Sequence, residues 1–372
     1  MKFTLRENKV LKKVILSRDI AMDLGTSSVL VHVQDEGIIM REPSVVAIDK
    51  NTDRVIKVGR EAEEMLGRNS EDVLALYPLS DGVVSRYEVT LKMLRYFIHR
   101  ASKKNIVAPR LMIALPTDVN EVERRAILDA ATEAGARKTF IVQEALAAAI
   151  GAGIPVNSPI GNMIVNIGGG TTEVSVISLG GIVVSKTVRV GGNHFDAAIV
   201  DHVRENYNLL IGTRTAETLK RHIGCVYEHK EAKVEDVKGR DLESGMPKIA
   251  SVSSREFLGA VMAPLTAIFD AICEVIEKTP PELVGDILHN GICFVGGGSM
   301  IFGLDKLTER VLGIKAYVAK NPDECVILGA AKRFEIYNKV SDGVLKFEKT
   351  DKSKKQKSSK KTVTEDDGAG VV

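Results

Sequence analysis

The chain has 372 residues, 44% of them hydrophobic, and a formal net charge of +2. Its length exceeds what one ordinary core accommodates, so we expect two domains. The near-neutral charge argues against a polyanion binder, and because no run of 18 apolar residues occurs we predict no membrane-spanning helix. The four cysteines form no CxxC pair, which indicates a reducing compartment.

Residues 1–18 form a basic segment, with six lysines and arginines against one acid. Apolar residues recur in it at helical spacing and the lysines lie mostly opposite, which predicts a short amphipathic helix. Two interpretations stay open. The segment is either a membrane-surface anchor or a frayed leader of which residues 14–16 belong to the first strand.

The stretch from residue 19 to residue 155 begins with β structure and continues with helices. Residues 19–56 have a strand pattern, and helices are predicted over 60–68, 89–101, 120–134 and 145–150. Asn120 and Glu123 have the spacing of a capping box, and Gly135 is placed to end that helix. Continuous apolar character predicts a buried central strand over 111–115.

The same order, a hairpin followed by helices, restarts at about residue 160. We expect helices over 195–223 and 257–278, a strand over 292–295, and a polar, β-like insert over 228–257. This internal repeat predicts an α/β protein of two similar lobes, with β-sheets flanked by helices and a cleft between the lobes.

The predicted boundaries follow from that repeat. The first lobe is expected over 19–155 and 331–340, with a small insert at about 41–79. The second is expected over 156–330, with an insert at about 191–257. High charge and low hydrophobicity predict a disordered tail over 341–372.

A phosphate-loop signature occurs twice. The copies are Asp23-Leu24-Gly25-Thr26-Ser27-Ser28 and Asn166-Ile167-Gly168-Gly169-Gly170-Thr171-Thr172, each between two apolar β-type runs. Glycine turns let backbone N–H groups approach phosphate oxygens, since no Cβ blocks them. Asp23 ends a strand at the gap, where a carboxylate can hold water ligands of a phosphate-bound Mg²⁺. With a third glycine cluster at 296–298, the two hairpins predict a site that holds a nucleotide triphosphate from both sides.

These motifs resemble those of the MreB family, the bacterial actins of the actin-like ATPase superfamily. Further resemblance is carried by Glu42-Pro43-Ser44-Val45-Val46-Ala47 and Glu277-Lys278-Thr279-Pro280-Pro281-Glu282-Leu283, and it extends over about 19–337. The resemblance implies an actin-like fold of duplicated RNase H-like domains with a nucleotide cleft between two lobes. It also implies ATP or ADP and Mg²⁺ as cofactors, and homopolymer filaments that scaffold cell shape or wall elongation.

Location and partners follow from the same resemblance. It implies a cytoplasmic protein, peripheral on the inner face of the cell membrane. The implied partners are further copies of the chain, anionic inner-membrane lipids and membrane proteins of the shape or elongation machinery; nucleic acid is not expected.

The resemblance also assigns roles to individual residues. It places the phosphates against Thr26, Ser27, Ser28, Gly168, Gly169 and Gly170. It places ribose and adenine against Glu217, Thr218, Leu219, Lys220, Gly296, Gly297, Gly298 and Ser299. Glu144 occupies the position of the acid that orients the attacking water, and Thr171 that of its catalytic partner; hydrolysis of this kind needs mainly positioned water and stabilised charge. From the residues alone, Glu144 is more simply an acid at a helix N-terminus.

The chain departs from the family pattern around this site. Asn166 stands where the family has Asp, and Gln143 and Ala145 flank Glu144 in place of Glu and Pro. Asparagine keeps an oxygen for a Mg²⁺-bound water but loses the charge, and hydrogen bonds to charged groups contribute about 1.5–3 kcal/mol. We therefore expect ATP to bind and to be hydrolysed slowly. The alternatives are a nucleotide-gated scaffold that has lost hydrolysis through Asn166 and a metabolic enzyme of the sugar-kinase type.

An apolar pair, Ile106 and Val107, lies at the tip of a predicted loop over 102–109, beside Lys103 and Lys104. An apolar tip with a basic flank suits insertion at an anionic bilayer, and the matching loop of the family contacts the membrane. Ordinary packing against the domain is the alternative for this pair. The lysine run at 352–361 is expected to be a solvated tail rather than a lipid or nucleic-acid site.

Overall fold

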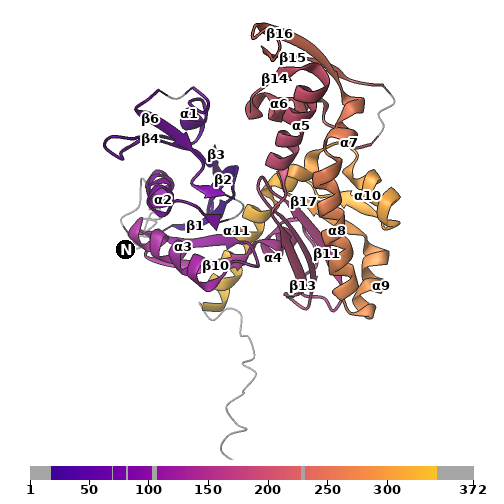
Figure 1. The fold of residues 1–372 in the computed structure, drawn as a ribbon. Helices are drawn as coiled ribbons and strands as arrows, with labels where there is room; N and C mark the ends of the chain where they lie inside the picture. The colour runs from indigo at the N-terminus through magenta and orange to yellow at the C-terminus, as the bar shows by residue number, and fades with distance from the viewer. Residues whose placement is uncertain (1–17, 69, 81–82, 103–106, 228–230, 342–372) are drawn as a thin grey trace, which may run out of the picture. The chain divides into compact units, whose positions relative to one another are not determined.

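The computed structural model of the chain describes residues 18–68, 70–80, 83–102, 107–227 and 231–341. The predictions for residues 1–17, for Ile106 and for the tail beyond residue 341 lie outside these residues. The chain divides into a large compact unit, Met1–Phe334, and a second unit, Glu335–Val372. Two mixed five-stranded sheets form the framework of the large unit (Figure 1).

The first sheet contains β1 (Asp19–Leu24), β2 (Ser28–Val33), β3 (Gly37–Pro43), β9 (Arg110–Leu115) and β10 (Lys138–Gln143). Its strand order is β10-β9-β1-β2-β3. β1 pairs antiparallel with β2 and parallel with β9, and β9 has a neighbour on each side, which confirms its prediction as an internal strand.

The second sheet repeats this plan. It contains β11 (Asn162–Ile167), β12 (Thr172–Ser178), β13 (Gly181–Val188), β17 (Ile292–Val295) and β18 (Ala316–Val318). The strand order is β13-β12-β11-β17-β18, with β11 antiparallel to β12 and parallel to β17. The hairpin predicted to restart at about residue 160 is therefore present and occupies the same place in its sheet as the β1–β2 hairpin.

Two helices form a central layer between the sheets. They are α4 (Glu144–Gly151) and α11 (Cys325–Ser341). Alternation along the strands sends one set of side chains toward this layer, for example Ala21 and Leu30 from the first sheet and Ile164 from the second. The alanine-rich sequence of α4 suits this place because small side chains let both sheets approach it.

The outer face of each sheet is covered by other helices (Figure 1). The first sheet packs on α2 (Tyr87–Ser102) and α3 (Glu121–Glu133). The second packs on α8 (Met262–Lys278), α9 (Pro281–Asn290) and α10 (Leu304–Leu312). The same hydrophobic core continues into α5 (Gly192–Tyr207), α6 (Thr213–Ile223) and α7 (Phe257–Ala260), of which α5 and α6 pack on each other and on strands β14 and β15. The predicted capping box of Asn120 and Glu123 is present at the start of α3, and Gly135, with φ of +108°, follows its end.

Smaller elements complete the chain. One three-stranded sheet has the order β5-β4-β6 and contains β4 (Val46–Asp49), β5 (Val55–Val58) and β6 (Val73–Leu76). Another has the order β14-β15-β16 and contains β14 (Leu209–Leu210), β15 (Val234–Asp241) and β16 (Pro247–Ser253). The remaining elements are α1 (Arg60–Glu63), β7 (Leu79–Ser80), β8 (Val83–Val84), η1 (Ser254–Glu256), η2 (Gly297–Met300) and η3 (Pro322–Glu324).

Three predicted helices differ from the observed ones. The helix predicted over 60–68 is only the four-residue α1. The helix predicted over 195–223 is two helices, because Asn208 takes a left-handed conformation (φ +54°) and β14 then pairs with β15. The helix predicted over 257–278 breaks at Val261. Pro264 explains the break, since it lacks an N–H for the carbonyl of Ala260 and its ring crowds that group.

Within the described residues, no helix taken singly combines the length and the hydropathy needed to cross a membrane. One pair bent by 57°, Ser254–Ala260 with Met262–Lys278, passes that test on length and composition alone.

Candidate functional site

The two glycine turns have the same backbone hydrogen bond. The N–H of Gly25 donates to the carbonyl of Ser28 at 3.1 Å, and the N–H of Gly168 donates to the carbonyl of Thr171 at 2.8 Å. The two turns therefore close over the same number of residues, and Asp23 in β1 and Asn166 in β11 stand at equivalent positions, each two residues before the first glycine.

The structure brings the two turns together. The hydroxyl of Ser27 donates to Oδ1 of Asn193, at the start of α5, over 2.9 Å. A Cβ on Gly169 would lie 1.9 Å from Oγ of Ser27, so only glycine fits at this contact. Residues 166 positions apart in the sequence thus join the β1–β2 turn to the start of α5, and the contact between Ser27 and Gly169 joins it to the β11–β12 turn.

The start of α5 fixes the second turn from behind. The N–H groups of Gly192 and Asn193 donate to the carbonyls of Gly168 and Gly169 at 2.9 and 2.8 Å. In the described part of the chain, the N–H groups of Gly169 and Gly170 have no acceptor. In this turn the carbonyl groups are hydrogen-bonded, while two N–H donors have no acceptor in the part of the protein that the structure describes. Such a turn is suited to bind an anion.

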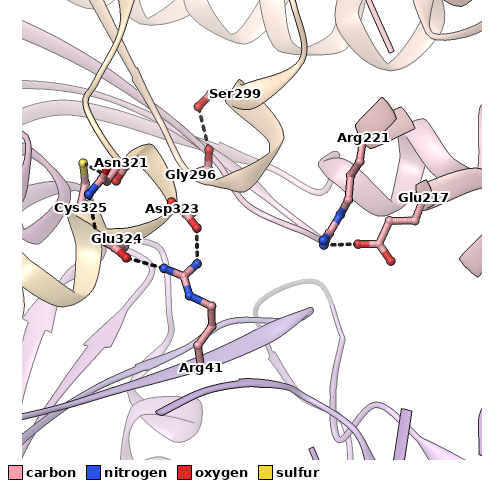
Figure 2. Close-up of polar contacts among 9 residues, drawn as sticks. All are labelled: Arg41, Glu217, Arg221, Gly296, Ser299, Asn321, Asp323, Glu324 and Cys325. Carbon is pink, nitrogen blue, oxygen red and sulfur yellow. Dashed lines mark hydrogen bonds and ion pairs between the residues drawn. The ribbon is translucent and has the colours of Figure 1, made fainter. Parts of the chain in front are cut away.

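The third glycine cluster packs against the end of β11, because β17 is its parallel neighbour. A Cβ on Gly296 would lie 2.3 Å from the carbonyl oxygen of Ile167, and one on Gly298 would lie 2.4 Å from Cγ2 of the same residue. Gly296 also has φ of +83°, which favours glycine. The buried hydroxyl of Ser299 donates to the carbonyl of Gly296 at 2.7 Å and fixes the loop (Figure 2).

The four candidate residues on α6 have different surroundings. Nζ of Lys220 lies 2.8 Å from a carboxylate oxygen of Asp196 and donates to the carbonyl of Gly192, so this side chain is tied to the start of α5. Glu217 is partly exposed and accepts from Arg221 at 2.6 Å (Figure 2). Thr218 is exposed and its hydroxyl donates to a carbonyl of its own helix, whereas the side chain of Leu219 lies in the core of the second sheet.

Asp23, Glu144 and Asn166 converge on the central layer. Asp23 shares a strand face with Ala21, and Asn166 shares one with Ile164, both of which face that layer. Glu144 is the first residue of α4, as predicted for an acid at a helix N-terminus. Nδ2 of Asn166 donates to Oε1 of Glu144 at 2.7 Å.

Burial raises the pKa of the acids in this region. Desolvation raises the pKa of Asp23 well above its ordinary value, and the charge of Glu144 adds to the shift. The pKa of Glu144 is raised by burial, opposed by the hydrogen bond from Asn166 and supported by the charge of Asp118.

Glu173, which the sequence analysis did not single out, is a further member of the site. Burial, then the charge of Glu144, raises its pKa to about 8. It stands opposite Asn166 in the hairpin register, so both side chains share a face. Its Oε1 accepts from the N–H of Thr117 at 3.2 Å, while its buried Oε2 has no hydrogen-bond partner among the described residues. The sequence did contain a signal for this residue. Glu173 is the one acid in β12, a strand whose other residues are small or apolar and buried.

These acids fit a hydrated cation better than a directly ligated one. Among the described residues, no group of three or more His, Cys, Asp or Glu side chains could hold a metal ion directly. Mg²⁺ keeps several waters, and an unpartnered carboxyl oxygen such as that of Glu173, which lies near enough to Glu144 to be affected by its charge, is a group that such waters can contact.

Comparisons with known proteins agree with this geometry. The family model described as MreB/Mbl protein matches residues 17–342. The chain is 41% identical to the cell shape-determining protein Mbl of Bacillus subtilis, over 88% of this chain and 98% of that protein. It is 43% identical to the cell shape-determining protein MreB of Escherichia coli, over 87% of this chain and 94% of that protein. The chain belongs to the MreB/Mbl family.

Solved structures confirm the actin-like fold of this MreB/Mbl chain. MreB5 of Spiroplasma citri bound to ADP matches with a TM-score of 0.84 and 37% identity, covering 88% of this chain and 98% of that one. The same protein bound to AMPPNP matches equally well. The MamK double helical filament matches with a TM-score of 0.73 and 25% identity, covering 86% of this chain and 99% of that one.

The MreB/Mbl chain also contains a charged contact that the sequence did not reveal. The guanidinium of Arg41, on β3, bonds the carboxylates of both Asp323 and Glu324 in η3 (Figure 2). The neighbouring Pro322 accepts from the N–H of Gly296 at 2.8 Å, so η3 links Arg41 to the third glycine cluster.

Of the proposed membrane-contact pair in this MreB/Mbl chain, only Val107 lies in the described residues, where its side chain is half-buried. Membrane contact by this loop therefore stays a prediction.

Proposed function

We propose that this chain is an ATP-binding actin that forms filaments of its own copies and scaffolds cell shape or wall elongation. Membership of the MreB/Mbl family supports this, and so do the matching relatives, which are cell shape-determining proteins. MreB5, the matching structure with the higher TM-score, binds ADP and AMPPNP, and MamK forms a double helical filament.

The contact between Ser27 and Gly169 carries the nucleotide part of the proposal. It brings the two glycine turns together. The N–H groups of Gly169 and Gly170 have no acceptor among the described residues and can donate to an anion. We assign the phosphates to these two turns, from Thr26 to Ser28 and from Gly168 to Gly170. Ribose and adenine are assigned to the start of η2 and to the exposed side of α6.

Slow hydrolysis is assigned to Glu144 and Thr171. Glu144 has a raised pKa but accepts a hydrogen bond from Asn166, which favours its ionised form as an acceptor for the attacking water. Thr171 closes the second turn next to the phosphate N–H groups. Mg²⁺, when bound through water by Asp23, with Asn166 as a further candidate, would neutralise phosphate charge during the reaction.

The nucleotide site is tested by adding a methyl group at its narrowest contact. Gly169→Ala places a Cβ against Ser27, whereas Gly181→Ala in β13 meets nothing within 4 Å and serves as the control. We expect Gly169→Ala to weaken binding of a fluorescent ATP analogue by about tenfold or more, the size of a lost charge-assisted contact, with the control unchanged. Equal affinity of both variants, with both folded by circular dichroism, would contradict the site.

Assembly and location are tested together. We propose that the filaments lie on the inner face of the membrane and contact anionic lipid through the Ile106–Val107 loop, the basic segment 1–18, or both. Electron microscopy with and without ATP, on and off anionic liposomes, is expected to show filaments only with ATP and mainly on lipid. Filaments with ATP but no phosphate release would instead indicate a scaffold that has lost hydrolysis.

A further inference from the structure

Asn166 is the point at which this chain departs from the family pattern, and the structure gives its side chain a specific partner. The side chain is 3% exposed, and its amide nitrogen donates to Glu144 at 2.7 Å. We propose that Asn166 is a positioning residue whose amide holds the carboxylate of Glu144 in the orientation that activates water. The inference rests on the proposed hydrolytic role of Glu144.

The amide of Asn166 is oriented from both ends. Its oxygen lies against the third glycine cluster, where a Cβ on Gly296 would come within 2.6 Å of Oδ1. The glycine leaves room for that oxygen, and the NH₂ group is then directed to Glu144. Only the nitrogen of an amide can donate, so this orientation determines which group Asn166 binds.

An aspartate at this position could not make the same contact. An ionised carboxylate only accepts hydrogen bonds, so it would face Glu144 without a proton between them. The charge of Glu144 already acts on Asp23 and Glu173, and Asp118 acts on Glu144. A further negative charge would add repulsion among buried acids, whereas the neutral amide supplies a donor and adds none.

The hydrogen bond also restricts a flexible side chain. Glu144 begins α4, and the hydrogen bond to its carboxylate in the described part of the chain comes from Asn166. A glutamate side chain loses substantial rotational freedom when ordered, and the bond from Asn166 removes that freedom before water binds. Asn166 therefore affects hydrolysis by orienting Glu144, and it does not need to contact the nucleotide.

The test compares Asn166→Ala and Asn166→Asp with wild type. We measure phosphate release at saturating ATP and Mg²⁺, affinity for a fluorescent ATP analogue, and the Mg²⁺ concentration that gives half-maximal nucleotide binding. Asn166→Ala is expected to lower kcat by about tenfold or more, the size of one charge-assisted hydrogen bond. Asn166→Asp loses the same donor but adds the charge that the family has here, so its effect is followed in the melting temperature of the nucleotide-free protein, which is expected to fall. Nucleotide affinity and the Mg²⁺ midpoint of Asn166→Ala are expected to stay near wild-type values.

Two further variants separate positioning from folding. Asn162→Ala removes an asparagine on the same face of β11 whose amide bonds only a nearby carbonyl, and it should leave kcat unchanged. The double change Glu144→Gln with Asn166→Asp exchanges donor and acceptor. It is expected to restore the melting temperature lost in Asn166→Asp without restoring turnover.

Several results would overturn the inference. An unchanged kcat in Asn166→Ala would overturn the positioning role, and a shifted Mg²⁺ midpoint in the same variant would assign Asn166 to the metal alone. A wild type that binds ATP but releases no phosphate contradicts the positioning role and leaves the nucleotide site standing. A wild type that binds no ATP overturns the proposed function and this inference together.

Discussion

Glu173 is a carboxylic acid inside a buried strand, and its environment determines its protonation. The side chain is 3% exposed, one of its oxygens has no partner among the described residues, and its pKa is raised to about 8. At neutral pH the folded protein therefore retains a proton here that an unfolded chain would release.

The stability of the protein should consequently fall as pH rises. Between the ordinary value of 4.5 and about 8, the folded state binds more protons at Glu173 than the unfolded state does, so unfolding becomes easier with each rise in pH. Asp23 and Glu144 shift in the same direction. We expect the melting temperature of the nucleotide-free, chelator-treated protein to decline from about pH 5 to about pH 8.

Glu173→Gln should make this decline shallower, because glutamine does not titrate. The exposed Glu282 provides the control, and Glu282→Gln should retain the wild-type slope. Thermal unfolding followed by circular dichroism measures the slopes. The same slope in Glu173→Gln as in wild type would show that this carboxyl is ionised when the protein is folded.

At the scale of elements, the central layer depends on two glycines where α4 crosses α11. A Cβ on Gly329 would lie 1.7 Å from the carbonyl oxygen of Ala147, and one on Gly151 would lie 1.8 Å from that of Cys325. The helix backbones are therefore in direct contact, which no other residue type permits.

Gly329→Ala should separate these helices and destabilise the protein. Overpacking a well-packed core costs about 1–3 kcal/mol, so the free energy of unfolding in urea should fall by that amount. Gly285→Ala, in α9, meets nothing within 4 Å and should raise stability by about 0.5 kcal/mol through helix propensity. Equal stability of the two variants would mean that the crossing relaxes without cost.

At the scale of the whole large unit, polar contacts between distant segments join the parts that carry the two sheets. They include Ser27 with Asn193, Thr117 with Glu173, and Arg41 with Asp323 and Glu324. The last is partly exposed, with 45% of the Arg41 side chain accessible, so salt should screen it.

Arg41→Ala is accordingly expected to lower the free energy of unfolding by less than about 1 kcal/mol at low salt. The difference from wild type should shrink further at about 1 M salt, where the screening length is a few ångströms. Arg125→Ala removes an exposed pair within a single helix and is the control. A loss that persists at high salt would show that packing of the Arg41 stem matters more than its charge.

Local signals were readable from the sequence, and long-range ones were not. The glycine turns and the capping box of α3 each depend on a few adjacent residues, and both were predicted at the right place. The end of α5 depends on pairing between β14 and β15, which the sequence does not display. The partners of Asn166, Glu173 and Arg41 lie far away along the chain, so their contacts required the structure.

The attachment of the second turn to α5 has a mechanical consequence. The helix holds the carbonyls of Gly168 and Gly169 at one end, and at the other the carbonyl of Asn208, which directly follows the helix, accepts from the N–H of Leu242 beside the β15–β16 hairpin. Its 16 residues span about 24 Å as a stiff rod. An axial shift of the second glycine turn is therefore expected to move, through this helix, the distant β15–β16 hairpin, which exposes Met246 and Ile249.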